Sequence, residues 1–308
     1  MRLVILGLIA AIAAASACGQ TPPASTIPAS LVREGVTEKL TDHVWAIPDG
    51  SAPLVPNIGI IVGSKGVLVV DTGLGVRNGE TVLKEVKKVW GAPKPIYIVA
   101  THFHPEHDLG ANAFPPDAKM IRSEDQKKDI AESGLQLANM FAQRSPLNAE
   151  LLKDATFRPA AISFDKEYSL DLGGLTARII AVGANHTRGD TIVFVDGVLF
   201  SGDDAMRPQP SVMAQGATMT HWLATLDQLD ALKPKHVVPS HGPRGDAAII
   251  EGYRVYLTRI KNRAAALKRE RKSEAEAIQI ITDEMSAQYP DKGRLGGAIR
   301  AAYAEANG

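Results

Sequence analysis

The chain has 308 residues, of which 45% are hydrophobic and 22% charged, a composition typical of globular proteins that excludes a disordered, fibrous or multispan membrane protein. Its 34 basic and 34 acidic side chains cancel, so no net charge favours a polyanionic partner, and we expect no nucleic acid. A single cysteine excludes a disulfide framework and a cysteine-rich metal site. Any metal site must therefore use histidines and carboxylates.

The first residues are typical of an export signal. Arg2 precedes an apolar run over residues 3–15, which is too short to span a bilayer, and small side chains follow it. Ala15-Ser16-Ala17-Cys18 resembles a bacterial lipoprotein box. We therefore predict export to the periplasm, with lipidated Cys18 as a membrane anchor; secretion after cleavage at Ala17 is the alternative.

Short apolar runs and amphipathic stretches alternate after the N-terminal region. Strands are predicted at residues 43–47, 58–62, 66–70, 95–100, 175–182, 191–195, 198–201 and 237–240. Helices are predicted at 81–90, within 124–155, at 221–232 and from about 250 onward, with Ser273 and Glu276 as a capping box. This alternation favours an α/β fold.

Four segments follow from this pattern. They are a signal peptide (1–18), a flexible tether rich in Pro and Ser (19–40), the main domain (41–245) and a helical C-terminal extension (246–308).

Three of the eight histidines fall within residues 102–107, directly after a predicted buried strand. His102 and His104 are two residues apart in an extended stretch, so their side chains point the same way. Glu106 and His107 follow after a proline. Because open α/β sheets bind ligands at the carboxyl ends of their strands, and imidazole with carboxylate suits Zn, Fe or Mn, this segment predicts a metal site.

Three more ligand-type residues each follow a predicted strand. They are His186, Asp203 and His241. Each alone is also explained as a capping aspartate or a hydrogen-bonded loop histidine, but their recurrence at strand ends favours one shared metal centre.

These pieces, taken in order with Val69-Val70-Asp71-Thr72-Gly73, resemble the metallo-β-lactamase superfamily over roughly residues 40–245. The resemblance implies a four-layer αββα sandwich with the metals at one edge of the two sheets. It implies a first metal held by His102, His104 and His186, and a second held by Glu106, His107 and His241, with Asp203 bridging both. Asp71 would orient the loops that carry the ligands. His43, His221 and His236 match no family position and are predicted to be structural, with His221 a candidate for the edge of the site.

Two departures from the family pattern bear on function. Glu106 stands where the family usually has Asp, and its extra methylene shifts the carboxylate at the second metal. Asp203 at the bridging position resembles the broad hydrolase branches, such as glyoxalase II and lactonases, more than the dedicated β-lactamases.

The sequence therefore predicts a zinc-dependent hydrolase with about two Zn²⁺ per chain, in which metal-bound hydroxide attacks an acyl bond of a small-molecule lactone, ester, thioester or β-lactam. Glu106 and Asp203 are the predicted catalytic carboxylates. Residues 49–57 and 124–155 are expected to shape the pocket, with Leu54, Val55, Met140 and Phe141 as candidates for an apolar wall. For Met140 and Phe141, packing in the core is the favoured interpretation. An iron-dependent oxidoreductase and an exported accessory or binding protein of the same fold are the alternatives.

Overall fold

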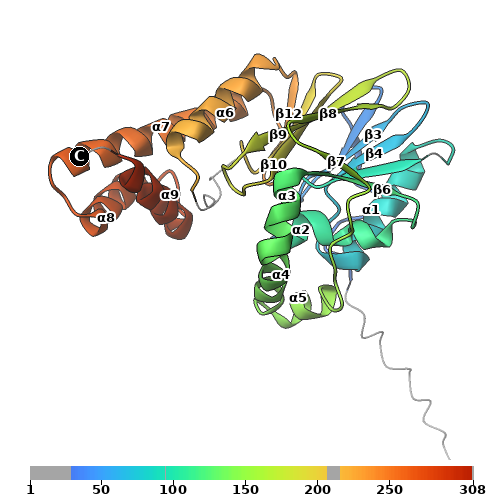
Figure 1. The fold of residues 1–308 in the computed structure, drawn as a ribbon, viewed down its shortest axis with the longest axis horizontal. Coiled ribbons are helices and arrows are strands. Elements are labelled where there is room, and N and C mark those ends of the chain that lie inside the picture. Colours follow the sequence, from blue (N-terminus) through green and yellow to red (C-terminus); the bar gives the residue numbers. More distant parts are fainter. Residues whose placement is uncertain (1–28, 94, 207–215, 307–308) are drawn as a thin grey trace, which may run out of the picture.

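The computed structural model describes residues 29–93, 95–206 and 216–306. Within them two β-sheets lie face to face, with helices on their outer sides (Figure 1). This is the predicted αββα sandwich. None of the helices in these ranges is both long and apolar enough to span a bilayer. The predicted signal peptide, Cys18 and the first part of the tether lie outside the described residues and stay predictions.

The first sheet has the strand order β1-β2-β3-β4-β5-β6-β7, antiparallel up to β4 and parallel from there on. Its strands are β1 (Glu38–Lys39), β2 (Val44–Ile47), β3 (Ile58–Val62), β4 (Val67–Val70), β5 (Ile96–Val99), β6 (Lys119–Ser123) and β7 (Ile162–Phe164). The carboxyl ends of β4 and β5 therefore lie side by side at one edge of the sandwich.

The second sheet has the order β12-β11-β10-β9-β8, in which only the β11–β12 pair is parallel. Its strands are β8 (Glu167–Asp171), β9 (Thr176–Gly183), β10 (Asp190–Val195), β11 (Val198–Gly202) and β12 (His236–Pro239). Ser240, just after β12, donates its backbone N–H to Gly202 O at 2.9 Å, so β11 and β12 end together.

The strands are apolar on both faces because both faces are buried. Ile61 and Leu68 face the second sheet, whereas their neighbours Ile60 and Val69 face the helical layer outside the first sheet. The two sheets approach closely at Gly59, where a Cβ atom would lie 2.5 Å from the Phe200 ring. Successive side chains of one strand thus pack alternately against the other sheet and against the outer helices.

The helices cover the two outer faces and one edge. They are α1 (Gly75–Val89), α2 (Pro105–Asp108), the 3₁₀ helix η1 (Leu109–Ala113), α3 (Glu124–Asp129), the π-helical turn η2 (Ile130–Gly134), α4 (Leu135–Ala142), α5 (Pro146–Leu151), α6 (Met219–Ala231), α7 (Ala248–Arg269), α8 (Glu274–Met285) and α9 (Lys292–Glu305). The capping box of Ser273 and Glu276 is present at the start of α8. The C-terminal helices extend sideways from the second sheet (Figure 1).

Two predicted boundaries are wrong. Helix α1 begins at Gly75, six residues before the predicted start at 81, and the early turns were missed because Asn78 interrupts their apolar spacing. Asn78 is buried, and its Oδ1 accepts the backbone N–H groups of Leu31 and Val32. Those bonds fix the chain before β1, so the part of the predicted tether from residue 30 onward belongs to the folded domain.

Candidate metal centre

The predicted ligands converge because four strand ends meet at one edge of the sandwich. The segment from Thr101 to α2 follows β5, and it carries His102, His104, Glu106 and His107. The β9–β10 loop carries His186, the turn after β11 carries Asp203, and the loop after β12 carries His241. The structure brings all seven side chains together.

Their donor atoms form three overlapping groups, in each of which the atoms lie within 4.8 Å of one another. The groups are His102, His104 and His186; His102, His107 and Asp203; and Glu106, His107 and His241. The first and third match the two predicted metal positions, and Asp203 shares its group with one histidine from each. His186 Nε2 lies 3.2 Å from His104 Nδ1 and 3.5 Å from Asp203 Oδ2.

Acceptors behind the site orient two of the imidazoles. His107 Nδ1 donates to Asp71 Oδ2 at 2.9 Å, and His241 Nδ1 donates to Val55 O at 3.1 Å. Because each Nδ1 faces an acceptor, each Nε2 is directed at the centre of the cluster. Both rings are thus held in the orientation that a metal ligand needs.

Asp71 is the predicted orienting residue, and the structure shows how it works. It has a left-handed backbone (φ 63°), which Asp tolerates better than most side chains. Its Oδ1 accepts the backbone N–H of Thr101 at 2.7 Å, while its Oδ2 accepts from His107 and from Thr101 Oγ1. One buried carboxylate therefore connects the end of β4 to both ends of the histidine segment.

Close backbone contact fixes the same segment from the other side. Thr72 Oγ1 lies 3.0 Å from the carbonyl oxygens of His107 and Asp108. Gly110 packs so tightly that a Cβ atom there would lie 2.1 Å from Thr72 O. The helix that presents Glu106 and His107 is thus rigidly attached to the first sheet.

Burial and neighbouring charge set the protonation of the histidines. Burial, together with the surrounding imidazoles, lowers the pKa of His102 and of His104 well below 6.5, so both are neutral at pH 7. His107 differs: burial opposes its charge, but the ion pair with Asp71 outweighs this and raises its pKa to about 9. Two imidazoles are ready to bind a cation, and the third must first release a proton.

Three buried atoms at the centre lack a hydrogen-bond partner within the described part of the chain. They are His102 Nε2, His107 Nε2 and Glu106 Oε2. Leaving a buried polar atom unsatisfied costs about 1–3 kcal/mol, so such a cluster needs a ligand to account for it. A metal cation bound by these atoms would satisfy all three.

Two further buried carboxyl groups support the His186 and Asp203 loops, and the sequence analysis missed both. Asp190 accepts the backbone N–H groups of Asn185, His186 and Thr187. Asp204 accepts from Asn185 Nδ2 at 2.8 Å. Burial, and the proximity of Asp203, raise the pKa of Asp204 to about 8, while burial and Asp204 raise the pKa of Asp190 well above its usual value. Both carboxyl groups therefore hold a proton to a higher pH than an exposed aspartate does.

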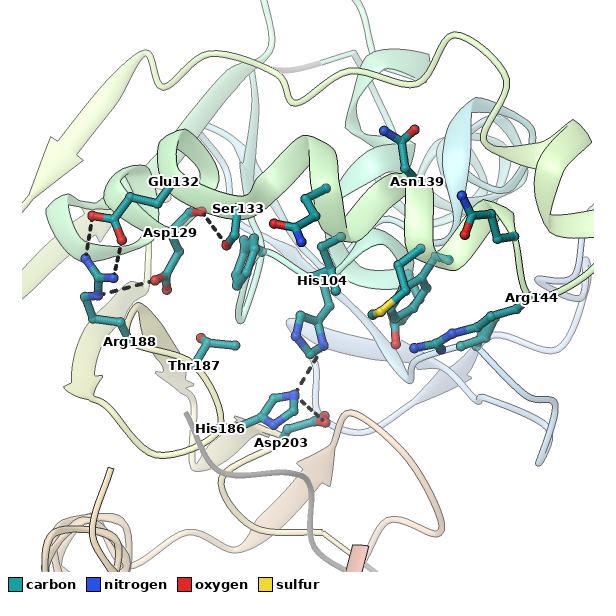
Figure 2. Close-up of a pocket in the computed structure, with 18 of the residues that line it drawn as sticks. His104, Asp129, Glu132, Ser133, Asn139, Arg144, His186, Thr187, Arg188 and Asp203 are labelled. Carbon is teal, nitrogen blue, oxygen red and sulfur yellow. Dashed lines mark hydrogen bonds and ion pairs between the residues drawn. The ribbon is translucent and has the colours of Figure 1, made fainter. Parts of the chain in front are cut away.

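The metal-ligand cluster opens into a pocket of about 1150 Å³ (Figure 2). Leu54 lines it, as predicted, and so do Met140, Phe141 and Leu137. The core packing that the sequence favours for Met140 and Phe141 is confirmed for Phe141, which is 3% exposed, and wrong for Met140, which is 48% exposed. The prediction is wrong for Val55, whose side chain is buried in the core beneath the first sheet. Helix α4 and the loop before β3 thus give the pocket an apolar wall.

The opposite wall is charged but internally paired. Arg188, from the β9–β10 loop, lies between Asp129 and Glu132, with its Nε 3.5 Å from Asp129 Oδ1. Asp129 Oδ2 also accepts the backbone N–H of Gly189 at 2.8 Å. These contacts join η2 to the loop that carries His186 (Figure 2). None of these residues was predicted, because each depends on a partner about 60 positions away.

The three histidines predicted to be structural do not line the pocket. His43 Nδ1 lies 3.2 Å from Val62 O, and His221 Nε2 lies 3.1 Å from Val182 O. His236 is exposed in β12. His221 therefore belongs to the packing of α6 on β9 and not to the edge of the site.

Comparison with known protein families shows to which family the chain belongs. The family model of the metallo-beta-lactamase superfamily matches residues 52–241, more than half of the chain. The chain belongs to the metallo-beta-lactamase superfamily. The matched region contains every residue of the candidate metal centre.

Similar proteins within and around this superfamily include sulfatases as well as lactamases. A linear primary-alkylsulfatase from a Pseudomonas species is 26% identical over 216 residues, which cover 59% of this chain and 40% of the alkylsulfatase. The chain therefore spans less than half the length of that relative.

Solved structures show the same fold at low identity. The sec-alkylsulfatase Pisa1 from Pseudomonas superposes with a TM-score of 0.64 at 16% identity, covering 87% of this chain and 49% of Pisa1. A metallo-beta-lactamase from Pontibacter korlensis has a TM-score of 0.54 at 22% identity, covering 72% of this chain and 98% of that protein. At these identities the structures establish the architecture alone.

Proposed function

We propose that this superfamily member is a two-zinc hydrolase that cleaves an acyl bond in a small molecule. The observation that carries the proposal is the convergence of seven ligand-type side chains into overlapping groups around three buried atoms that have no hydrogen-bond partner among the described residues. The donor set of imidazoles and carboxylates without thiolate is the set that suits catalytic zinc.

The residues fit two zinc ions. His102, His104 and His186 would hold the first, Glu106, His107 and His241 the second, and Asp203 would contact both. When bound, zinc supplies a Lewis acid and lowers the pKa of water toward about 7.

The protein's own contribution is orientation and proton transfer. Asp71 and Val55 O hold the His107 and His241 rings so that each Nε2 faces the centre. Glu106 and Asp203 place carboxylate oxygens at the inner end of the pocket, where they orient the attacking water and accept or return its proton. The apolar wall of α4 excludes bulk water from the same region.

Replacing ligands tests this role directly. We expect His102→Ala and Asp203→Ala to abolish hydrolysis of lactone, ester, thioester and β-lactam substrates while circular dichroism and thermal unfolding show a folded protein. His236→Ala, which changes an exposed histidine outside the pocket, is the matched control and should retain activity. Wild-type rates in either ligand variant would refute the proposal.

A sulfate ester is the second candidate bond. It is favoured by the alkylsulfatase relative, which is similar in sequence over more than half of this chain. Sulfate release from octyl sulfate, measured beside hydrolysis of an octanoate ester of equal chain length, separates the two candidates. Turnover of the sulfate alone would replace the acyl proposal with a sulfatase, whereas turnover of the carboxylic ester alone would exclude sulfate esters.

A further inference from the structure

Arg144 lines the pocket without a carboxylate partner among the residues that the structure describes. The other arginines of the pocket are paired: Arg188 with the two carboxylates of the charged wall, and Arg294 with Asp291 at 3.4 Å. The positive charge of Arg144 is therefore not neutralised by the pocket itself. A guanidinium in this position is a binding group for an anion.

The guanidinium is held in place by its neighbours. Its central carbon lies 3.6 Å from the centroid of the Phe141 ring, within the range of a cation–π contact. Phe141 is buried in the cluster formed by α4, α5 and η1, so the platform under the guanidinium is rigid. This stacking reduces the conformational entropy that the side chain would lose on binding.

The same ring connects Arg144 to the metal-ligand cluster. The Phe141 ring centroid lies 6.0 Å from that of His104, so only one aromatic ring separates the guanidinium from a candidate ligand. Figure 2 shows Arg144 and His104 directed into one pocket.

Apolar side chains surround this cation. Met140, on the last turn of α4, is 48% exposed, and Leu54 and Leu137 also line the pocket. An exposed methionine beside a stacked arginine gives a surface that suits a molecule with one charged and one apolar part.

We infer that Arg144 is a specificity residue that binds an oxyanion of the substrate, a carboxylate or a sulfate, while Leu54 and Met140 contact the apolar part of the molecule. The substrate class is then an amphiphilic organic anion. The planar guanidinium fork matches both oxyanions, because each presents two oxygens at suitable spacing. The statement that the bound anion is a substrate rests on the proposed function, whereas the binding of the anion by Arg144 does not.

Binding to the zinc-free protein tests the inference without turnover. Isothermal titration calorimetry would use octanoate, octane-1-sulfonate and the neutral 1-octanol as probes, after zinc has been removed so that anions cannot bind the metals. We expect Arg144→Gln to weaken the binding of an anionic probe about tenfold and to leave 1-octanol unchanged. Arg144→Lys keeps the positive charge but loses the planar guanidinium. Its affinity for the anionic probe should lie between those of the wild type and Arg144→Gln.

Arg294→Gln is the matched control, because it removes the charge of another arginine that lines the pocket. It should bind all three probes as the wild type does. If Arg144→Gln loses affinity for octanoate alone, the recognised group is a carboxylate. If it loses affinity for octane-1-sulfonate alone, the recognised group is a sulfate-like oxyanion. Unchanged anion binding in a folded Arg144→Gln variant, an equal loss for 1-octanol, or no binding of either anion to the wild type would overturn the inference. Failure to hydrolyse any ester would count against the proposed function alone.

Discussion

At the scale of single residues, Asp71 determines how His107 is presented. Asp71→Asn keeps Oδ1 for the Thr101 N–H but places an amide donor where Oδ2 now accepts from His107 Nδ1. Two donors then face each other, so the ring must rotate or change tautomer. We expect zinc affinity, measured by competition with a chelator, to fall about 10- to 100-fold.

The control for this variant is Asp171→Asn, the same substitution at an exposed carboxylate that pairs with Lys65. It should leave zinc affinity unchanged. Equal affinities for Asp71→Asn and the wild type would show that the hydrogen bond to His107 has no part in zinc binding.

The raised pKa of His107, about 9, makes zinc binding depend on pH. Below pH 9 the His107 imidazole of the zinc-free protein is a cation, with a second proton on Nε2 in addition to the one that Nδ1 donates to Asp71. A metal can bind Nε2 only after this second proton leaves. Zinc affinity should therefore rise as pH increases toward 9. Calorimetry at pH 7.5 in buffers of different ionisation enthalpy should show release of about one proton per chain. A binding enthalpy independent of the buffer would contradict this protonation state.

Residues differ in how well sequence predicts their place. His102, His186 and His241 could be located because each directly follows a recognisable strand. Arg144 could not, because its role depends on the Phe141 ring beneath it and on a turn after α4 whose direction the sequence does not show. The assignment of individual ligands to metals came only from the family resemblance.

At the scale of elements, a buried ion pair connects β6 to α2. Arg122 in β6 forms a bidentate pair with Asp108, and both side chains are almost fully buried. Arg122→Met leaves the Asp108 carboxylate buried without its counter-ion. We expect the free energy of unfolding in urea to fall by about 3–5 kcal/mol.

The surface pair of Arg178 with Glu167 provides the comparison. Because both of its members are partly exposed, Arg178→Met should cost less than about 1 kcal/mol. Similar losses in the two variants would mean that burial does not strengthen the role of the Arg122 pair.

The buried pair of Arg122 with Asp108 explains why strand β6 was not predicted from the sequence. The segment Lys-Met-Ile-Arg-Ser breaks the apolar run that marks a buried parallel strand, yet Arg122 is buried because Asp108, fourteen positions earlier, neutralises it. Strands β3, β4 and β5, whose faces are uniformly apolar, were predicted to within one residue. Patterning therefore predicts elements stabilised by apolar burial and misses those stabilised by distant polar partners.

At the scale of the whole molecule, the C-terminal helices belong to the main fold. The apolar face of α7 packs with α6 and the second sheet in one cluster, in which the Tyr253 and Trp222 rings lie 5.6 Å apart. Helical periodicity in the sequence does not determine whether these helices pack on the core or on another subunit. The structure shows that α7 packs on the core, and this contact lies behind the Asp203 loop, since Tyr253 Oη donates to Asp203 O at 3.4 Å.

Truncation tests whether the C-terminal helices and the sandwich fold as one cooperative unit. A chain that ends at Gly245 exposes Trp222 and its neighbours, so we expect it to lose the single cooperative unfolding transition and to aggregate in size-exclusion chromatography. Val255→Ala, at an exposed position of α7, is the control and should unfold as the wild type does. A truncated chain that unfolds cooperatively at the wild-type urea midpoint would show that the extension is an independent unit.

The central claim, that this sandwich carries a two-zinc hydrolytic centre, is tested most directly by the metal content of the purified protein. Elemental analysis for Zn, Fe and Mn should find about two zinc ions per chain in the wild type and a clear loss of zinc in His102→Ala. Iron in place of zinc, or a single metal per chain in the presence of excess zinc, would contradict the account and show that Glu106 builds a different second site.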